Sequence, residues 1–408
     1  MAGLHYDVVI IGAGPAGVSA AKRAAELGAD VLILEKEAEL GVKPCGEGVL
    51  KGVLRELGIR PRREFIRNEL KGAYIFGPKG AVLRVLADEI KYEKFRGRGG
   101  GYIVDKRAFL EHVLSGALEA GANAWFSSKA IAFKMEGGRP KAVVVKRGSD
   151  VVEVSCSLVI GCDGYWSITA KKLFGLGPQE VIPCLQYVLD GCSISEPDMA
   201  RAYVGRRWAP LGYLWVFPRG PSSANVGLGV RGCAAKPYLE KFIRNDEELK
   251  NARVREAKAA LVPIGGLREP LVVDGAMLCG DAAGQVVPIT GEGIHPAMTA
   301  GFIAGEVAAK AIQEGDVSAS RLREYEERFK ERWGPVIEVG LLARKAFEVL
   351  PDDKIDRVLR LLDVEKGVMV IDGPDIGPFV LDLLSKDPDL CAEIFGSLVQ
   401  EVVASAGC

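Results

Sequence analysis

Several features that would assign a protein to a class are missing from this sequence. Lysine and arginine together number 53 against 54 aspartates and glutamates, so no positive excess favours nucleic-acid binding. The nine cysteines are scattered, without a CxxC pair or a Cys/His cluster of the spacing that zinc or iron–sulfur sites need. We therefore expect no metal site, no nucleic-acid partner and a mostly reduced protein inside the cell.

Long apolar runs are missing as well. No stretch reaches the roughly 18 uninterrupted apolar residues of a membrane-spanning helix, so we expect any membrane contact to be peripheral. The chain enters a strand pattern at Tyr6 without a basic leader or a cleavage site, which predicts a protein that is not secreted. These observations predict a cytoplasmic protein whose membrane contact, where it exists, is on the inner face.

Glycine, in contrast, is abundant. It supplies 50 of 408 residues, about 12% against a usual value of about 7%. The surplus predicts several places where the backbone approaches another group closely. A chain of 408 residues also exceeds the length that a single hydrophobic core usually serves, which predicts two or three subdomains.

The N-terminal segment predicts a βαβ unit. In YDVVIIGAGPAGVSAAKRAAELGADVLILEK, the apolar runs over 6–11 and 31–34 predict two buried strands with a helix between them. Gly12, Gly14 and Gly17 make the pattern GxGxxG, in which the first glycine allows a tight turn, the second admits a pyrophosphate and the third lets helix pack on strand. We expect these glycines to bind a dinucleotide at the helix N-terminus.

An acidic residue completes this dinucleotide pattern. Glu35 ends the second predicted strand, where a carboxylate accepts a hydrogen bond from a ribose hydroxyl, so FAD or NAD is favoured over a 2′-phosphorylated nucleotide. A second GxGxxG match, GLGVRG at 227–232, has no such acid and lies in a proline-bounded segment. We expect no second dinucleotide fold there.

The segment 272–312 favours FAD over NAD. Its sequence predicts a strand that ends at Asp281, a loop, and a long helix that begins near Gly293 and Ile294. Asp281 would accept a hydrogen bond from a ribityl hydroxyl, and the helix start would direct its positive end at the flavin pyrimidine oxygen. A further strand ends at Asp163. The three junctions in this order predict an FAD site.

Together the GAGPAG, DG and GDAAG junctions resemble the FAD-binding fold of the aromatic-hydroxylase type. More narrowly, KPCGEGV at 43–49 and YLWVFP at 213–218, followed by GLG, resemble the geranylgeranyl reductase family, in particular its archaeal digeranylgeranylglycerophospholipid reductases. The resemblance covers most of 4–310 and implies an FAD enzyme. The FAD contacts that it implies are at Ala16, Glu35, Cys45, Gly46, Gly48, Asp281, Gly293 and Ile294.

One position departs from the family pattern. The family usually has an arginine three residues before a phenylalanine in the helix that follows its Y-V-x strand, whereas YIVDKRAF has Lys106 there and Arg107 next to it. Lysine supplies a charge but not a bidentate fork. We take both residues as cofactor-binding candidates, together with a backbone contact near Ala130.

The run PLGYLWVFP places Tyr213, Trp215 and Phe217 on one side of a predicted strand, because successive strand residues face opposite sides. For a polyprenyl substrate, which the resemblance implies, these rings would line a slot in which the chain lies against the flavin. The alternative is that they are ordinary core residues of a sheet.

The implied substrate sets a chemical demand. An isolated trisubstituted alkene has no carbonyl to withdraw electrons, so hydride transfer to it requires a proton source. Cys45 is our first candidate for the catalytic acid, with His295 behind it. The alternatives are that Cys45 is only a small turn residue, that His295 is only a first-turn helix residue, and that a water held by backbone groups supplies the proton. The external electron donor stays open among ferredoxin, a deazaflavin and NAD(P)H.

Two further segments have weaker patterns. The stretch 89–102 combines a glycine run with basic residues that either hold an anionic lipid headgroup or form a solvated loop; these are Lys91, Lys94, Arg96 and Arg98. The C-terminal stretch 378–406 has apolar residues at helical spacing, which predicts a helix that packs on the domain, caps the lipid tunnel or lies on a membrane surface.

The expected fold is α/β, with an FAD-binding Rossmann-like domain, an inserted antiparallel-sheet substrate domain and a helical C-terminal region. The predicted function is saturation of geranylgeranyl double bonds by FAD. A flavin monooxygenase and an electron-transfer flavoprotein that reduces quinone are the alternatives. The predicted limits are 1–72 with 101–172 and 268–312 for the FAD domain, 73–100 with 173–267 for the substrate domain, and 313–408 for the C-terminal region.

Overall fold

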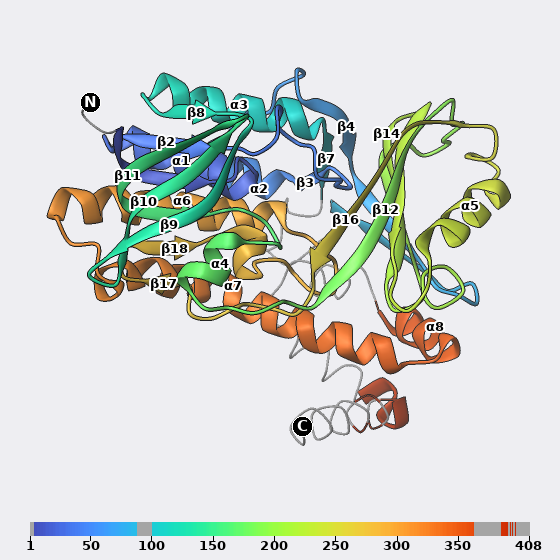
Figure 1. The fold of residues 1–408 in the computed structure, drawn as a ribbon. Helices are drawn as coiled ribbons and strands as arrows, with labels where there is room; N and C mark the ends of the chain where they lie inside the picture. The colour runs from blue at the N-terminus through green and yellow to red at the C-terminus, as the bar shows by residue number, and fades with distance from the viewer. Residues whose placement is uncertain are drawn as a thin grey trace. The chain divides into compact units, whose positions relative to one another are not determined.

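The computed structural model describes residues 4–87, 100–362 and 385–390, and residues 392, 394 and 396. It divides into two compact units, each built from three segments of the chain, and each unit is described by itself below (Figure 1). The first unit comprises Met1–Val42, Lys106–Glu180 and Pro263–Ile337; the second comprises Lys43–Asp105, Val181–Val262 and Glu338–Cys408. The predicted domain limits stay a prediction.

A largely parallel sheet forms the centre of the first unit. Its order is β17–β18–β11–β1–β2–β8, and only β17 runs antiparallel to its neighbour in this row. Val8, Val9 and Ile10 of the central strand are fully buried, as expected for a parallel strand covered on both faces. The strands are β1 (His5–Ile11), β2 (Val31–Leu34), β8 (Asn123–Trp125), β11 (Asp150–Gly161), β17 (Val272–Val273) and β18 (Ala276–Leu278).

Strands β9 (Ser128–Glu136) and β10 (Arg139–Arg147) continue the sheet from β11 in antiparallel pairs. Their inward residues share an apolar cluster with those of β1 and β2. The helices of this unit are α1 (Pro15–Glu26), α3 (Lys106–Glu119), α4 (Ile168–Leu173), α6 (Ile294–Glu314) and the beginning of α7 (Ala319–Val349), with a 3-10 turn η3 (Gly280–Ala283) before α6.

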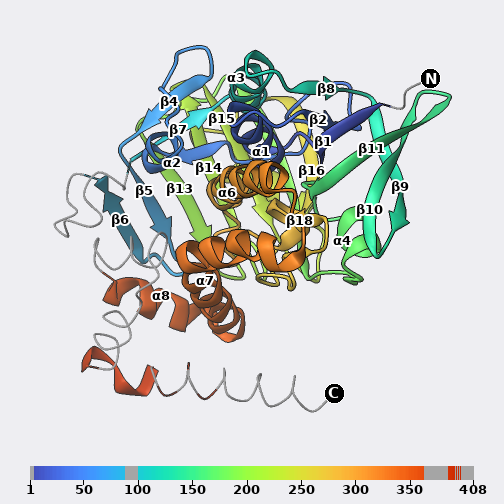
Figure 2. The same ribbon diagram turned by 90° about the vertical axis from the view of Figure 1, so that its left-hand side faces the viewer.

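Helix α1 lies between α3 and α6 (Figure 2). The contact with α6 is made by backbone: a Cβ atom at Gly301 would stand 2.1 Å from the Ala16 carbonyl oxygen, and one at Gly305 would stand 2.4 Å from that of Ala20. Glycine at both positions therefore lets the two helices approach more closely than side chains would permit.

A seven-stranded sheet forms the second unit, in the order β16–β12–β15–β14–β13–β5–β6. All its described pairings are antiparallel except that of β13 with β5. The predicted α/β organisation with an antiparallel insertion is confirmed. The strands are β5 (Gly72–Phe76), β6 (Val82–Leu86), β12 (Val181–Asp190), β13 (Met199–Val204), β14 (Tyr213–Gly220), β15 (Ser223–Gly229) and β16 (Arg253–Pro263).

The remaining elements of the second unit pack around this sheet. Helix α5 (Ala235–Asn245) covers one face through Leu239 and Phe242. The second GxGxxG match begins inside β15, which pairs with antiparallel neighbours, so it opens no βαβ unit. A three-stranded sheet is made by β3 (Gly48–Leu50), β7 (Gly101–Val104) and β4 (Ile66–Leu70), with α2 (Lys51–Glu56) after β3.

Helix α8 (Asp352–Leu361) fastens the β5–β6 turn. The carboxylate of Asp356, a residue that is 5% exposed, accepts hydrogen bonds from the backbone N–H groups of Lys79, at 2.9 Å, and Ala81, at 3.0 Å. Apolar residues of α8, among them Ile355 and Val358, share a buried cluster with β6. This helix thus holds the hairpin through both charge and apolar contact.

Two sequence predictions lie wholly or mostly outside the described residues. The basic residues Lys91, Lys94, Arg96 and Arg98 lie outside the described residues, as does most of 378–406. Within the part of the chain that the structure describes, no helix is both long enough and apolar enough to span a membrane.

Candidate active site

The glycine turn between β1 and α1 uses its three glycines differently. Gly12 has φ of +99°, and a Cβ atom there would stand 2.4 Å from the Cys162 carbonyl oxygen. A Cβ atom at Gly17 would stand 1.9 Å from the Gly12 carbonyl oxygen, so the polypeptide itself requires glycine at both positions. Gly14 has an ordinary φ of −73°, and a Cβ atom there would meet nothing within 4 Å. The open space above Gly14 fits a group that approaches from outside the chain.

The start of α1 provides an anion site beside this space. Gly14 is the N-cap residue and makes no side-chain cap, while Pro15 at the first helical position has no N–H to satisfy. Uncapped N–H groups and the positive end of the helix dipole favour a phosphate. This arrangement fits the pyrophosphate of a dinucleotide.

Glu35 ties the second strand to the glycine turn. Its Oε2 accepts a hydrogen bond from the Ala13 N–H at 2.8 Å, and its Oε1 accepts one from the Glu37 N–H at 2.9 Å. An ionised carboxylate has about four acceptor positions, so a ribose hydroxyl can still bind. The carboxylate therefore both orders the turn and remains suited to the predicted contact.

The starts of α1 and α6 meet near Asp281. A Cβ atom at Gly280, where φ is +66°, would stand 3.3 Å from Cβ of Ala16, and one at Gly293 would stand 3.8 Å from Asp281 Oδ1. Gly293 is the N-cap of α6, which begins at Ile294 and has no side-chain cap. The structure thus brings Ala16, Asp281, Gly293 and Ile294 together in the first unit, with the positive ends of two helices.

Asp163 has a different role from the other junction acids. Its carboxylate accepts hydrogen bonds from Ser167 Oγ at 2.6 Å and from Thr169 N at 3.0 Å and Oγ1 at 3.1 Å. Burial raises the pKa of this carboxyl, although these hydrogen bonds oppose the shift. Asp163 therefore organises the beginning of α4.

The remaining candidates of the first unit have contrasting surroundings. Lys106 is 7% exposed at the start of α3, whereas the Arg107 side chain is 53% exposed and pairs with Glu39 and Glu111. Ala130 is buried on β9, opposite Val145 of β10. Of the two basic side chains, the one at the family's arginine position is the buried one.

His295 lies in the first turn of α6. It is 4% exposed, and its ring meets the Trp333 ring edge-on, with centroids 4.7 Å apart and an interplanar angle of 82°. The packing accounts for a histidine in this position structurally. Its predicted catalytic role stays a prediction.

In the second unit, Tyr213, Trp215 and Phe217 lie along β14. Neighbouring ring centroids are 5.7 and 6.4 Å apart, while the intervening Leu214 and Val216 are fully buried in the core beneath α5. The three rings therefore share the opposite face of the sheet, which we call the aromatic face.

The glycine of GLG opposite Trp215 makes room for this face. Gly227 pairs with Trp215 across the β14–β15 ladder, and a Cβ atom there would stand 2.5 Å from the indole and 2.7 Å from the Leu185 carbonyl oxygen. The YLWVFP and GLG segments thus contain a ring, Trp215, and the glycine that leaves room for it, Gly227.

The turn 44–48, here called the Cys45 turn, packs on the aromatic face. A Cβ atom at Gly46 would stand 2.6 Å from the Phe217 ring. Gln186, 3% exposed on β12, donates from Nε2 to the Cys45 carbonyl oxygen at 2.9 Å and accepts at Oε1 from Trp215 Nε1 at 3.1 Å. Cys45 is therefore tied to the aromatic face through one buried amide.

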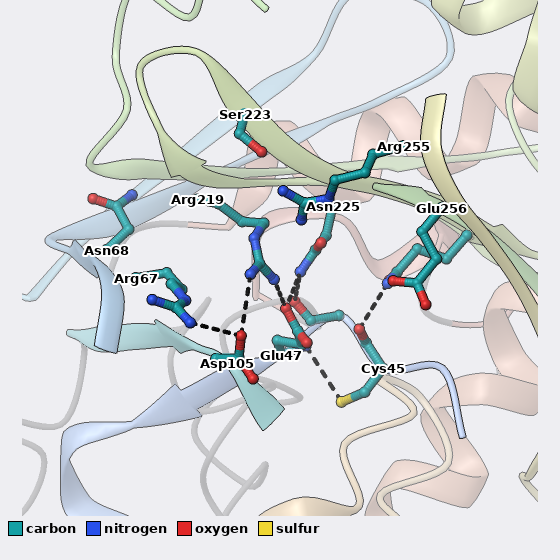
Figure 3. Close-up of polar contacts among 12 residues, drawn as sticks. Cys45, Glu47, Arg67, Asn68, Asp105, Arg219, Ser223, Asn225, Arg255 and Glu256 are labelled. Carbon is teal, nitrogen blue, oxygen red and sulfur yellow. Dashed lines mark hydrogen bonds and ion pairs between the residues drawn. The ribbon is translucent and has the colours of Figure 1, made fainter. Parts of the chain in front are cut away.

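A polar cluster also contacts the Cys45 turn (Figure 3). Glu47 has φ of +66°, and its carboxylate pairs with Arg219 and accepts from Asn225 Nδ2 at 2.8 Å. Asp105 joins the cluster, at 3.8 Å from Arg219 Nη2 and at 2.8 Å from Arg67 Nη2. No sequence pattern pointed to this cluster or to Gln186. The only signal was proximity to the motifs, since Glu47 lies within KPCGEGV and Arg219 follows YLWVFP.

Two family models match the chain. Residues 5–182 match a model described as an FAD binding domain, and residues 180–262 match one described as the geranylgeranyl reductase catalytic domain. The first match contains the glycine turn, Glu35 and Asp163; the second contains the aromatic face. The cofactor of this chain is FAD.

Curated relatives match nearly the whole chain. Digeranylgeranylglycerophospholipid reductase 2 of Methanopyrus kandleri is 36% identical over 95% of this chain and 98% of its own length. Digeranylgeranylglycerophospholipid reductase of Methanocaldococcus jannaschii is 36% identical over 94% of this chain and 96% of its own.

Solved structures agree in fold. A geranylgeranyl bacteriochlorophyll reductase-like protein of Thermoplasma acidophilum superposes with a TM-score of 0.85 at 31% identity, over 97% of this chain and 99% of that one. A flavin-dependent brominase, at 19% identity and a TM-score of 0.71 over 94% of this chain and 100% of that one, shares the fold alone. By its match over nearly the whole length of such relatives, the chain belongs to the digeranylgeranylglycerophospholipid reductase family.

Proposed function

We propose that this protein is an FAD-dependent reductase that saturates C=C bonds of geranylgeranyl chains in membrane-lipid precursors. The observation that carries the proposal is the aromatic face of β14 with the Cys45 turn packed on it. The names of the curated relatives support the substrate class. An external electron donor, either ferredoxin, a deazaflavin or NAD(P)H, and peripheral contact with a membrane complete the proposal.

Residues of the first unit hold the cofactor in this proposal. The start of α1 binds the pyrophosphate, Glu35 the ribose, Asp281 a ribityl hydroxyl and the start of α6 the pyrimidine end of the flavin. Reduced FAD supplies the hydride.

The aromatic face binds the prenyl chain. Each methylene removed from water contributes roughly 0.8 kcal/mol, so five or six contribute about 4 to 5 kcal/mol. Flat rings bring a large apolar area and lose little conformational entropy. Tyr213, Trp215 and Phe217 therefore hold the chain by contact and keep water away from the double bond.

Cys45 provides the proton. An isolated alkene carbon accepts a hydride only as the neighbouring carbon gains a proton. The half-buried Cys45 thiol carries such a proton, and Gln186 fixes the backbone carbonyl of the same residue.

The direct test is anaerobic. The protein is loaded with FAD, reduced, and mixed with a geranylgeranyl glycerophospholipid, while flavin absorbance and lipid mass are followed. We expect reoxidation of the flavin and the gain of a pair of hydrogen atoms for each double bond. Reoxidation by oxygen or a quinone alone, with the lipid unchanged, would instead identify a monooxygenase or an electron-transfer protein.

The aromatic face is tested by Trp215→Ala. We expect kcat/KM for the long lipid to fall about tenfold or more, which corresponds to about 1.4 kcal/mol, with an unchanged flavin spectrum. The matched control is Trp208→Ala, because the Trp208 ring packs among Tyr203 and Phe242 in the core on the other face of the sheet. Equal losses in both variants would remove the substrate role of Trp215.

A further inference from the structure

Glu47 holds a backbone conformation that its own side chain disfavours. Its φ of +66° lies in the left-handed region, which is uncommon outside glycine and costs roughly 1 to 2 kcal/mol for a residue with a Cβ atom. Residues keep such conformations where their surroundings over-determine them, and these places cluster at functional sites. Both neighbours in the same turn, Gly46 and Gly48, are glycines. A glutamate in the left-handed region between them therefore needs a structural reason.

The contacts of Glu47 supply that reason. Its carboxylate pairs with Arg219, whose side chain is 10% exposed, and accepts a hydrogen bond from Asn225, which is fully buried. The same Asn225 amide nitrogen donates to the Gly46 carbonyl oxygen at 3.1 Å. A charge-assisted bond and a buried amide thus fix both the side chain and the backbone of the turn.

The fixed turn in turn fixes Cys45. The Glu47 N–H donates to Cys45 Sγ at 3.3 Å, and the Glu47 carbonyl oxygen accepts from the Val104 N–H at 2.9 Å. On the other side, Gln186 holds the Cys45 carbonyl oxygen. The thiol is therefore located by contacts that depend on the conformation of Glu47.

We propose that Glu47, Arg219 and Asn225 are positioning residues, a clamp that holds the Cys45 thiol in place for protonation of the alkene. This inference rests on the proposed function, in which Cys45 supplies the proton. The clamp itself touches the reaction only through the Cys45 turn.

The test is a set of double-mutant cycles on the FAD-loaded protein, with steady-state lipid reduction as the readout. In the wild-type background, we expect Glu47→Gln and Arg219→Met each to lower kcat about 30-fold with KM changed less than about twofold, because a displacement of about 1 Å at a reacting group can cost about a hundredfold. In the Cys45→Ala background, we expect the same changes to lower the residual kcat less than about threefold. A purely structural role would lower both backgrounds equally and would overturn the proposal.

Two further variants separate charge from backbone. Glu47→Gly suits a φ of +66° without strain but removes the carboxylate, so we expect it to be as slow as Glu47→Gln; wild-type kcat in Glu47→Gly would overturn the clamp. Arg219→Lys keeps the charge, and we expect it to recover at least about threefold in kcat over Arg219→Met. No recovery, with FAD content and melting temperature equal in both variants, would count against the clamp.

Arg201→Met is the matched control. The Arg201 side chain is 15% exposed and pairs with Glu248 at 2.9 Å, and Arg201 lies across the ladder from Val216, on the face away from the aromatic rings. We expect its kcat within about twofold of wild type; a 30-fold loss would show that any such ion pair in the sheet matters equally. If Cys45→Ala alone keeps wild-type kcat while lipid is reduced, the acid role of Cys45 fails but the reductase function stands. If the wild-type protein reduces no lipid, the proposed function itself fails.

Discussion

The contacts of helix α1 in the first unit and the Cys45 turn in the second use glycine for different physical purposes. In the first unit, Cβ atoms at Gly17 and Gly301 would stand 1.9 and 2.1 Å from backbone carbonyl oxygens. In the second unit, a Cβ atom at Gly46 would stand 2.6 Å from the Phe217 ring, with only side-chain atoms among its nearest neighbours. Backbone cannot give way without moving an element, whereas a ring can be replaced by a smaller side chain. The contacts of α1 should therefore reject substitution of Gly17 or Gly301 outright, and the Cys45 turn should accept substitution of Gly46 in a compensated pair.

The largest expected effect is that of Gly17→Ala. The added methyl group would overlap the Gly12 carbonyl oxygen, and overpacking of this kind costs about 3 kcal/mol, which lowers the melting temperature by about 3 to 4 °C in a protein of this size. The control, Gly14→Ala, fills open space, so the FAD-free protein should melt within about 1 °C of wild type while its Kd for FAD rises about tenfold. Thermal denaturation and flavin titration measure both. An equal melting-temperature loss in the two variants would contradict the distinction between them.

Next in size is Gly46→Ala with its compensating change. We expect it to destabilise by about 2 kcal/mol and to lower kcat for lipid about tenfold, because the Cys45 turn must lift from Phe217. Adding Phe217→Leu should reverse at least half of the decrease in melting temperature that Gly46→Ala causes. If the double variant is no more stable than the single one, the ring is not what Gly46 accommodates.

A smaller effect concerns charge between the helices of the first unit. Arg23 of α1 pairs with Glu306 of α6 at 2.9 Å, and hydrogen bonds from Lys310 and Arg23 lower the pKa of Glu306 from 4.5 to about 2 against the effect of burial. Because the folded-state pKa is depressed, this stabilisation is present above pH 4.5 and is lost as the pH falls toward 2. Glu306→Gln should melt about 1 °C lower at pH 7, as expected for about 1 kcal/mol, and should lose less stability than wild type across that pH window. A parallel pH dependence of the two proteins would contradict the assignment.

The smallest effect separates two adjacent basic residues. Lys106→Met should raise the Kd for FAD about fivefold, or about 1 kcal/mol, if the buried lysine serves as the family's arginine does. Arg107→Met removes an exposed pair worth at most about 1 kcal/mol and should leave the Kd unchanged. Flavin titration of both variants decides which residue serves the cofactor, and the reverse order would assign that role to Arg107.

More of the first unit than of the second could be predicted from the sequence, because the motif residues of the first unit are close together in the chain. Gly12, Gly14, Gly17 and Glu35 lie within one βαβ segment, so their spacing alone records the turn, the helix start and the acid. The strand and helix bounds there follow the apolar period closely: the run expected over 31–34 is β2. Local patterns suffice where the contacts are local.

In the second unit, the alternation of side chains along a strand predicted that the three rings share one face. No nearby sequence pattern predicted the residues that contact them. Glu47 meets Arg219 across 172 positions and Asn225 across 178, and Gln186 meets Cys45 across 141. A left-handed glutamate between two glycines also has no propensity signal, because tertiary contacts impose it. Strand pairing has to be known before such clusters can be found.

The hold of Asp356 on the β5–β6 turn has a consequence for synthesis of the chain. The amide of Lys79 leaves the ribosome 277 residues before its acceptor, an interval of about 14 to 55 s at about 5 to 20 residues per second. During that time the apolar side of β6, with Leu83 and Val85, is not yet covered by α8. The β5–β6 turn therefore gains its Asp356 contacts only after residue 356 has been synthesised, and a chain that stops before that point leaves Leu83 and Val85 without the cover of α8.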